Sequence, residues 1–270
     1  MSEYVLELKG ITKIFPGVKA LNNVQFQLKP GEVHALMGEN GAGKSTFIKV
    51  ITGVHKAEEG EMFLNGQKVD FKGPKDAQAA GIAAVYQHPT SYPDLTVAEN
   101  IFMGHEIVKN GMIQWREMNK QATALLKQLD ADFKSTDEMG ALSVAQQQMV
   151  EIVKAVSFDG RIIVMDEPTS SLSNDEVEQL FGIIERLKAK QVSIIYISHR
   201  MEELFRISDR VTIIRDGAYV GTKKTSETNA NELVAMMVGR ELESFYARDY
   251  NDLEHAETAL EAKNLTCEGV

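Results

Sequence analysis

The sequence predicts an α/β fold in which helices cover a sheet of buried strands and a mostly helical subdomain is inserted. Three observations predict it. Short apolar blocks alternate with segments of helical periodicity, a glycine-rich turn joins an expected strand to an expected helix, and the middle of the chain is poor in strand signals. The 270 residues, 43% hydrophobic and 25% charged, suit one large or two small globular domains.

Expected strands are of two kinds. Residues 4–8 and 24–28 alternate between polar and apolar side chains, and residues 33–37 lead directly into the glycine-rich turn. The blocks 162–165 and 192–197 are too short for helices and rich in β-branched residues, as is typical of strands buried on both faces.

Expected helices have apolar side chains at three- and four-residue intervals, with capping residues at or near their starts. They cover residues 45–52, 116–129, 144–156 and 174–189. Strands that alternate with helices predict a parallel sheet covered on both faces. The stretch from about 90 to 157 is expected to be the helical subdomain.

Residues 38–45 match the pattern G-x-x-x-x-G-K-[ST] between an expected strand and an expected helix. Glycines let backbone N–H groups curl around phosphate oxygens, and the helix N-terminus adds positive potential. Lys44 would neutralise the β- and γ-phosphates, and the Ser45 hydroxyl would bind Mg²⁺. The pattern predicts a nucleoside triphosphate site formed by Gly38, Glu39, Asn40, Gly41, Ala42, Gly43, Lys44, Ser45 and Thr46.

Two adjacent carboxylates, Asp166 and Glu167, end the buried strand that begins near Arg161. Parallel sheets bind ligands at this edge. Asp166 is expected to hold Mg²⁺, and Glu167 to take a proton from the water that attacks the γ-phosphate. An acidic turn after a core strand is the alternative, and the phosphate loop favours the catalytic interpretation.

Net charge, cysteine content and the length of apolar runs limit the partners and cellular locations that we expect. The net charge of −10 disfavours nucleic acid as a partner. The single cysteine, Cys267, cannot form an internal disulfide, which fits a reducing compartment. No apolar run approaches the ~20 residues that span a bilayer, and the N-terminus has no pattern of a secretion signal.

With these motifs in this order, residues 4–240 resemble the ATP-binding-cassette (ABC) ATPases. The resemblance implies a P-loop NTPase core with a mixed sheet and a helical subdomain, and ATP and Mg²⁺ as ligands. It implies that Gln87 contacts Mg²⁺ and the attacking water, that His199 bonds the γ-phosphate and orients this water, and that Phe15 stacks on adenine. Without the resemblance, Gln87 is better explained as a solvated polar residue after a strand. A core position explains Phe15 almost as well as stacking on adenine does.

Residues 142–146 stand where the family has L-S-G-G-Q, and here Val144 and Ala145 replace both glycines. In the family this segment reaches across a dimer to the γ-phosphate bound by the opposite subunit. The resemblance therefore implies that Ser143 and Gln146 contact a partner's nucleotide. Ser143 also fits a helix N-cap. The methyl group of Ala145 is expected to loosen the closed state.

The similarity is closer to the ATPases of ribose, galactose and xylose importers, in which two cassettes lie on one chain. It is carried by residues 15–21, 193–203 and 236–240. It implies a second cassette, in the same full-length chain or a homodimer, an integral membrane sugar permease and, indirectly, an extracytoplasmic sugar-binding protein. The expected location is the cytoplasmic face of the membrane, as a peripheral protein.

The tail repeats the start of the chain: the pattern at residues 6–12 recurs at 260–266, 254 residues later. Repetition at a fixed period indicates a second copy of the same unit, and chance similarity is the alternative. We therefore expect a nucleotide-binding domain over 1–243, a linker over 244–257 and the start of a truncated second cassette over 258–270.

Two other functions stay open at this point. One is a regulatory cassette that binds ATP with little turnover, which the altered signature favours and the intact Glu167 and His199 oppose. The other is a soluble ABC ATPase acting on nucleic acid or the ribosome, which the net charge disfavours.

For an importer, the expected docking groove of the permease lies near Gln87, Tyr92, Pro93 and Leu95.

Overall fold

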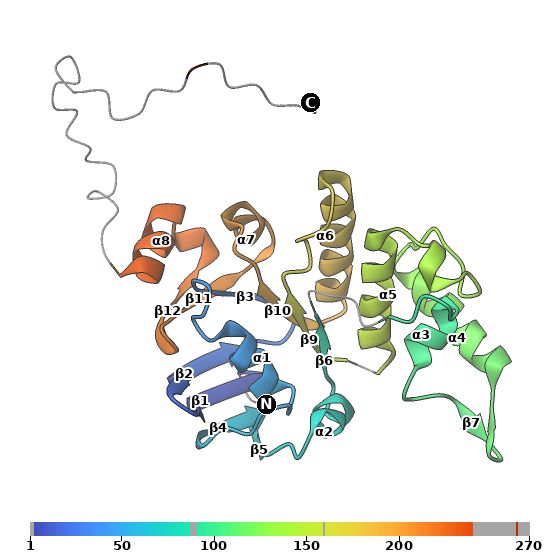
Figure 1. Ribbon diagram of the computed structural model, residues 1–270, viewed down its shortest axis with the longest axis horizontal. Coiled ribbons are helices and arrows are strands. Elements are labelled where there is room, and N and C mark those ends of the chain that lie inside the picture. Colours follow the sequence, from blue (N-terminus) through green and yellow to red (C-terminus); the bar gives the residue numbers. More distant parts are fainter. Residues whose placement is uncertain (1–2, 87–90, 159, 240–262, 264–270) are drawn as a thin grey trace.

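The computed structural model describes residues 3–86, 91–158, 160–239 and 263. One curled sheet encloses a helix on its inner side, and further helices lie on its outer side and beside it (Figure 1). The strands of this sheet are β1 Leu6–Phe15, β2 Val18–Leu28, β3 Val33–Met37, β4 Glu59–Leu64, β5 Gln67–Val69, β6 Ile82–Val85, β9 Ile162–Asp166, β10 Ser193–Ile197, β11 Arg210–Arg215 and β12 Ala218–Lys224. The helices are α1 Lys44–Ile51, α2 Pro74–Ala79, α3 Val97–Phe102, α4 Trp115–Gln128, α5 Val144–Ser157, α6 Asn174–Ala189, α7 Met201–Ile207 and α8 Ala230–Val238.

The strand order is β5-β4-β1-β2-β12-β11-β3-β10-β9-β6. The run from β11 through β3, β10 and β9 to β6 is parallel, whereas β5, β4, β1 and β2 pair antiparallel, as do β11 and β12. The mixed sheet that the resemblance implied is therefore confirmed. The wholly parallel sheet expected from the alternation of strands and helices is wrong for the outer strands.

Tight turns explain the antiparallel strands. Asn65-Gly66 joins β4 to β5 and Asp216-Gly217 joins β11 to β12, and all four residues have positive φ. Two-residue turns of this kind match the twist of antiparallel neighbours, and Asn-Gly and Asp-Gly are their commonest sequences. These pairs were present in the sequence as hairpin signals.

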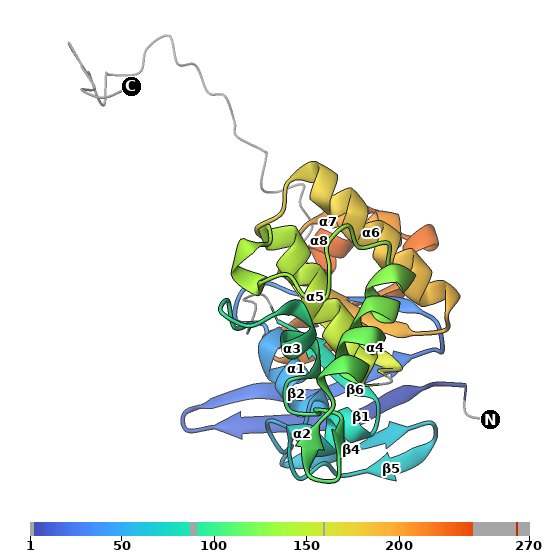
Figure 2. The ribbon, with the colours of Figure 1, turned by 90° about the vertical axis from the view of Figure 1, so that its right-hand side faces the viewer.

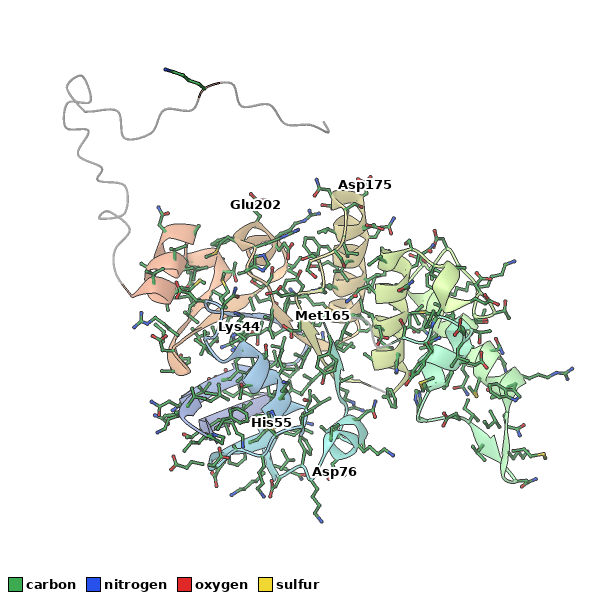
Figure 3. The ribbon with its side chains drawn as sticks, in the orientation of Figure 1. Lys44, His55, Asp76, Met165, Asp175 and Glu202 are labelled. Atoms are coloured by element: carbon green, nitrogen blue, oxygen red, sulfur yellow. The ribbon has the colours of Figure 1, made fainter. Side chains whose placement is uncertain are left out.

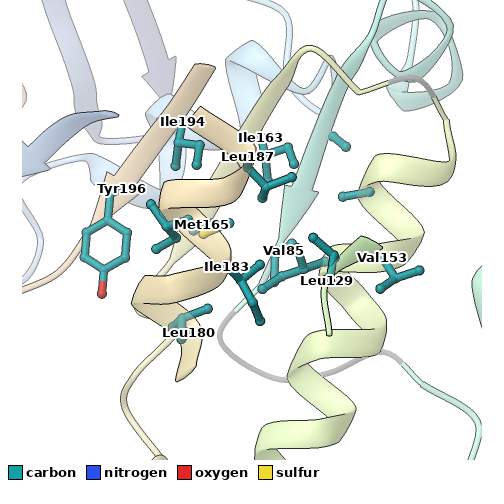
Figure 4. Packing of buried hydrophobic residues seen from close by; sticks show 14 of the residues in the cluster. Val85, Leu129, Val153, Ile163, Met165, Leu180, Ile183, Leu187, Ile194 and Tyr196 are labelled. Carbon is teal, nitrogen blue, oxygen red and sulfur yellow. The ribbon is translucent and has the colours of Figure 1, made fainter. Parts of the chain in front are cut away.

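The core lies on both faces of the sheet because its central strands are apolar at most positions. On β9, Ile163 and Met165 pack into the cluster shared with α5 and α6, and Ile162 and Val164 pack into the cluster shared with α1. Figure 4 shows the first cluster, in which Leu180, Ile183 and Leu187 of α6 meet this strand and its neighbours. Each such side chain contributes about 1.5–3 kcal/mol on burial.

The helices expected at 45–52, 116–129, 144–156 and 174–189 are confirmed as α1, α4, α5 and α6, with ends that agree within one residue. α3, α4 and α5 lie together at the β6 end of the sheet, and a small hairpin, β7 Val108–Lys109 with β8 Met112–Ile113, extends from them (Figures 1 and 2). Among the described residues, no helix combines the length and apolar character needed to cross a membrane.

Candidate functional site

The loop between β3 and α1 needs glycine at two positions. A Cβ on Gly38 would lie 2.2 Å from the carbonyl oxygen of Ile214, and one on Gly43 would lie 2.5 Å from that of Ala20. Gly43 also has a φ of +102°, in the region that favours glycine. α1 has no side-chain cap and no acidic residue in its first turn. Its N-terminal N–H groups and positive potential are therefore available to an anion.

Lys44, the first residue of α1, arches back over this loop. Its Nζ donates to the carbonyl oxygens of Gly38, at 2.7 Å, and Glu39, at 3.0 Å. Burial lowers the pKa of the Lys44 ammonium, and the Glu167 and Asp166 carboxylates oppose this shift. The ammonium is thus held directly above the loop, where it faces any phosphate that the loop binds.

A pocket of about 860 Å³ opens above the loop. It brings together nine of the residues predicted from the sequence. These are Phe15, Asn40, Gly41, Gly43, Lys44, Ser45, Thr46, Asp166 and Glu167. Figure 3 places Lys44 at the start of α1 and Met165, the residue before Asp166, on β9 near the centre of the molecule. Gly38, Glu39 and Ala42 belong to the loop itself.

Phe15 stands at the end of β1 and offers the pocket an aromatic ring. The ring lies edge-on to His55 at 5.2 Å between centroids, and the Lys13 ammonium lies 5.2 Å from its centre. These contacts leave the ring on the pocket wall, as stacking on a nucleobase requires.

The end of β9 meets the end of β10 because the two strands pair in parallel, with Asp166 opposite Ile197. The next residue, Glu167, donates its backbone N–H to the carbonyl oxygen of Ile197 at 2.9 Å. Two residues further along β10's exit lies His199, whose Nδ1 is 3.3 Å from Oε1 of Glu167. The register of the sheet thus brings together the predicted base and the predicted histidine.

The Asp166 side chain is half-buried. The His199 side chain, which contacts Glu167, is 62% exposed. Burial, and next the charge of Glu167, raise the pKa of the Asp166 carboxyl, while Lys44 opposes them. The described residues contain no group of three or more His, Cys, Asp or Glu side chains that could hold a metal by themselves. A hydroxyl from Ser45 and a carboxylate from Asp166 suit Mg²⁺, which takes few protein ligands and many from phosphate and water.

The signature segment lies elsewhere. Ser143 caps α5: its Oγ accepts from the Gln146 backbone N–H at 3.3 Å, and the Gln146 side chain returns a bond to the Ser143 N–H at 3.0 Å. Nε2 of Gln146 donates to Asp132. Neither residue lines the pocket that contains Lys44. Within the described part of the chain, they are not brought to the phosphate loop.

The two residues that replace the family's glycines face different ways. Val144, at the first position of α5, is 47% exposed. Ala145 is half-buried and lines a small cavity with Leu172 and Glu176, which belong to the segment entering α6 and to α6 itself. The side chain at this position therefore faces the neighbouring helix, and the expected effect of its methyl group on the closed state stays a prediction.

Five further residues line the pocket without having been expected from the sequence. They are Val18, Lys19, Ala20, Asp216 and Gly217. Long-range backbone bonds hold them there: Gly217 donates to Ala42, and Asn22 donates to Gly217. The Asp-Gly turn was a readable hairpin signal, but its place beside the phosphate loop depends on the strand order. Gln87 lies outside the described residues.

A family profile described as "ABC transporter" matches residues 21–170 of this chain. The chain belongs to the ABC transporter family. The match begins in β2 and includes the phosphate loop, the signature segment and the carboxylate pair, so it covers most of the pocket described above.

Two curated relatives match over most or all of the chain. The galactose/methyl galactoside import ATP-binding protein MglA 1 of Photobacterium profundum is 47% identical over 272 residues, covering 100% of this chain and 54% of that protein. The ribose import ATP-binding protein RbsA of Geobacillus kaustophilus is 47% identical over 240 residues, covering 88% and 49%. The chain therefore spans about half the length of the curated relatives it matches.

Solved ABC cassettes share the fold. The ADP conformation of MJ1267, an ATP-binding cassette of an ABC transporter, has a TM-score of 0.77 and 27% identity, and the match covers 88% of this chain and 100% of that one. The dimeric structure of MJ0796, a bacterial ABC transporter cassette, has a TM-score of 0.69 and 26% identity, covering 82% and 98%.

Proposed function

We propose that this chain binds ATP with Mg²⁺, hydrolyses it, and thereby drives import of a monosaccharide through a membrane permease. One observation carries the proposal: a glycine-lined phosphate loop, a lysine and two carboxylates share one pocket, and a histidine contacts the outer carboxylate. Membership of the ABC transporter family and the printed functions of the sugar-importing relatives support the transport role.

Binding begins at the loop. The backbone N–H groups at the start of α1 receive the phosphates, and Lys44 exchanges its bonds to Gly38 and Glu39 for bonds to phosphate oxygens. Ser45 and Asp166 would hold Mg²⁺, with Gln87 as a further ligand. When bound, Mg²⁺ neutralises charge on the β- and γ-phosphates. Phe15 stacks on the base.

Hydrolysis depends on Glu167 and His199. Glu167 accepts a proton from the water that attacks the γ-phosphate, and Gln87 helps to place this water. Nδ1 of His199 faces Glu167, which leaves Nε2 to face the γ-phosphate. The histidine thus connects the base to the group that reacts, and its orientation is set by the carboxylate.

A second cassette completes the site in this proposal. Ser143, Gln146 and the start of α5 lie away from the pocket of their own chain, and we infer that they bind the γ-phosphate held by a partner cassette. The dimeric MJ0796 cassette supports such pairing. The partner is either a second cassette of the same full-length chain or a second copy. Because the chain spans about half of its relatives, we favour the first, with a linker at 244–257 and the second cassette from 258.

The sugar is recognised by other subunits in this proposal: an integral membrane permease and an external sugar-binding protein that supplies it. Galactose and ribose are the sugars in the relatives' names, so the substrate class is a monosaccharide. The cassette would then work as a peripheral protein on the cytoplasmic face of the membrane, and nucleic acid has no part in the reaction.

The loop before α3 is the proposed docking site of the permease. Asn100 is 3% exposed, and its Oδ1 accepts from the Tyr92 backbone N–H. Its Nδ2 donates to the carbonyl oxygens of Tyr92, Leu95 and Thr96, so these bonds tie the loop to α3. Tyr92 itself is 53% exposed. Tyr92→Glu should reduce sugar uptake by about tenfold or more while basal ATP turnover stays within about twofold, measured in vesicles containing the assembled transporter. Unchanged uptake contradicts this docking site.

Lys44→Ala tests nucleotide binding. The loss of charge-assisted bonds to phosphate should weaken ATP affinity about 100-fold, which corresponds to roughly 2.7 kcal/mol. Lys49→Ala, an exposed lysine on the same helix, is the matched control and should bind like the parent. Titration calorimetry with ATP and magnesium measures both. Equal affinity of Lys44→Ala and the parent would remove the loop from the proposal.

A further inference from the structure

A buried carboxylate lies behind the pair formed by Glu167 and His199 without lining the pocket. Glu203, on α7, is 6% exposed, and its two oxygens accept hydrogen bonds from four side chains. The donors are Thr169 Oγ1 at 2.8 Å from Oε1, Tyr196 OH at 2.8 Å from Oε2, Ser198 Oγ at 2.9 Å from Oε2 and Arg200 NH1 at 3.3 Å from Oε1. The three hydroxyl donors are buried as well.

The donors come from the two segments that carry the proposed catalytic side chains. Thr169 follows Glu167 by two residues in the turn after β9. Ser198 and Arg200 stand on either side of His199, and Oγ of Ser198 also accepts from the Arg200 backbone N–H at 3.0 Å. Glu203 therefore ties both segments to a single group.

The turn after β9 needs such an anchor. Glu167 has a φ of +47°, an unfavourable backbone conformation for a residue with a side chain, which costs on the order of 1 kcal/mol. Its backbone bond to Ile197 and the bond from Thr169 to Glu203 hold the two ends of this strained turn. Without the second bond, the turn is free to relax toward an ordinary conformation and carry the Glu167 side chain with it.

A carboxylate is suited to this task because it only accepts. Its two oxygens offer about four lone-pair sites, and the three hydroxyls and one guanidinium fill them. Each hydroxyl proton is thereby committed to Glu203. An amide in the same place has a single accepting oxygen and a donating NH₂ group, so it leaves at least one buried hydroxyl proton without a partner.

We propose that Glu203 is a positioning residue, which holds the Thr169 segment against the segment from Ser198 to Arg200 and thereby keeps Glu167 and His199 within reach of each other. This inference rests on the proposed hydrolysis of ATP. Glu203 touches neither the pocket nor the 3.3 Å contact between Glu167 and His199, so it acts on the geometry of the chemical step and leaves nucleotide binding to the loop.

Four variants of the full-length protein, assembled with its membrane partner, test the proposal. Glu203→Gln keeps the shape of the side chain, and Thr169→Val removes a single donor. Thr169→Ser restores the hydroxyl, and Glu202→Gln changes the exposed neighbour on the same helix. We expect kcat for ATP to fall about 10- to 100-fold in Glu203→Gln and about tenfold in Thr169→Val. KM and the equilibrium affinity for ATP should stay within about twofold, and Thr169→Ser and Glu202→Gln should behave like the parent.

Two results would overturn the positioning role. One is a kcat of Glu203→Gln within about twofold of the parent. The other is a parallel loss of kcat and ATP affinity, which marks general damage to the fold rather than to the transition state. If Glu203→Gln does not fold, Thr169→Val decides by the same criteria.

Hydrogen exchange separates this inference from the proposed function. The peptides that contain residues 166–172 and 196–201 should exchange faster in Glu203→Gln or Thr169→Val than in the parent, whether or not the protein hydrolyses ATP. Unchanged exchange in both peptides overturns the anchoring of the two segments. If these peptides exchange faster in the variants but the parent protein does not hydrolyse ATP, the result contradicts the proposed function alone.

Discussion

Asp166 and Glu167 place two carboxylates side by side in one pocket, where the charge of each acts on Lys44. The raised pKa of Asp166 means that its ionised form is less favourable in the folded protein than in the unfolded chain. Such a group lowers stability above its folded pKa, and its effect disappears below its unfolded pKa of about 3.9. The site is therefore less stable than it would be without the charge, as is common where a cation is to be bound.

Asp166→Asn should raise the Tm of the nucleotide-free protein by about 2 °C at pH 7, because it removes the unfavourable charge. The gain should shrink as the pH is lowered, because the raised pKa of Asp166 lets it take up a proton in the parent at a higher pH than an ordinary aspartate does. Differential scanning fluorimetry from pH 7 downward measures it, with Asp94→Asn, an exposed carboxylate, as the control. A lower Tm for Asp166→Asn at pH 7 would contradict the claim that the charge of Asp166 destabilises the folded protein.

Motif spacing predicted the residues of the phosphate loop and the carboxylate pair because each motif lies within one strand, turn and helix. It did not predict Glu203. The bonds from Thr169 to Glu203 join residues 34 positions apart. No local sequence pattern predicts a contact between the turn after β9 and α7, because that contact depends on the pairing of β9 with β10. The same holds for Asp216, whose position in the pocket wall comes from the pairing of strands distant in sequence.

Among the helices, α5 combines a feature that the sequence predicted with one that it did not address. Its capping box, formed by Ser143 and Gln146, was predictable from sequence, since a serine stood three residues before a glutamine at the start of an apolar pattern. Which of the two following residues faces outward depends on how α5 packs on α6, and this is a tertiary property. Val144 is the side chain exposed at the proposed partner surface, and Ala145 is the one that packs inward.

Replacing each of these residues by glycine separates the two positions. Val144→Gly should raise ATP turnover about two- to fivefold, because it removes an exposed side chain from the end of the helix that we propose approaches a partner's phosphate. Ala145→Gly should leave turnover within about twofold. Both variants should lose up to about 1 kcal/mol of unfolding free energy. Steady-state kinetics of the assembled protein measures the rates, and faster turnover in Ala145→Gly alone would reverse the assignment.

The sheet was predictable in its centre and less so at its edges. Strands β9 and β10 were predictable as short apolar runs, because strands buried on both faces are apolar at most positions. β3 was predictable because residues 33–37 lead directly into the glycine-rich turn. β12 and β2 touch through a single parallel pair, Ala218 with Asn22, and nothing in the sequence near either residue signals that contact.

For the chain in its entirety, the order of motifs predicted the ABC fold and the family, and the family match bears this out. Ser143 and the start of α5 do not line the pocket that contains Lys44, and this separation supports the proposal that a second cassette completes the site. A chain of net charge −10 pairs with a like-charged copy only when attractive contacts, such as those to a shared nucleotide, outweigh repulsion.

ATP turnover by Glu167→Gln tests this account most directly. In the presence of magnesium, the variant should bind ATP within about twofold of the parent's affinity, because the loop and Lys44 are intact. Its turnover should fall at least about 100-fold, since a positioned general base contributes 10²–10⁴-fold. Glu185→Gln, an exposed glutamate on α6, should match the parent in both measurements. Turnover by Glu167→Gln at the parent's rate would contradict the central claim.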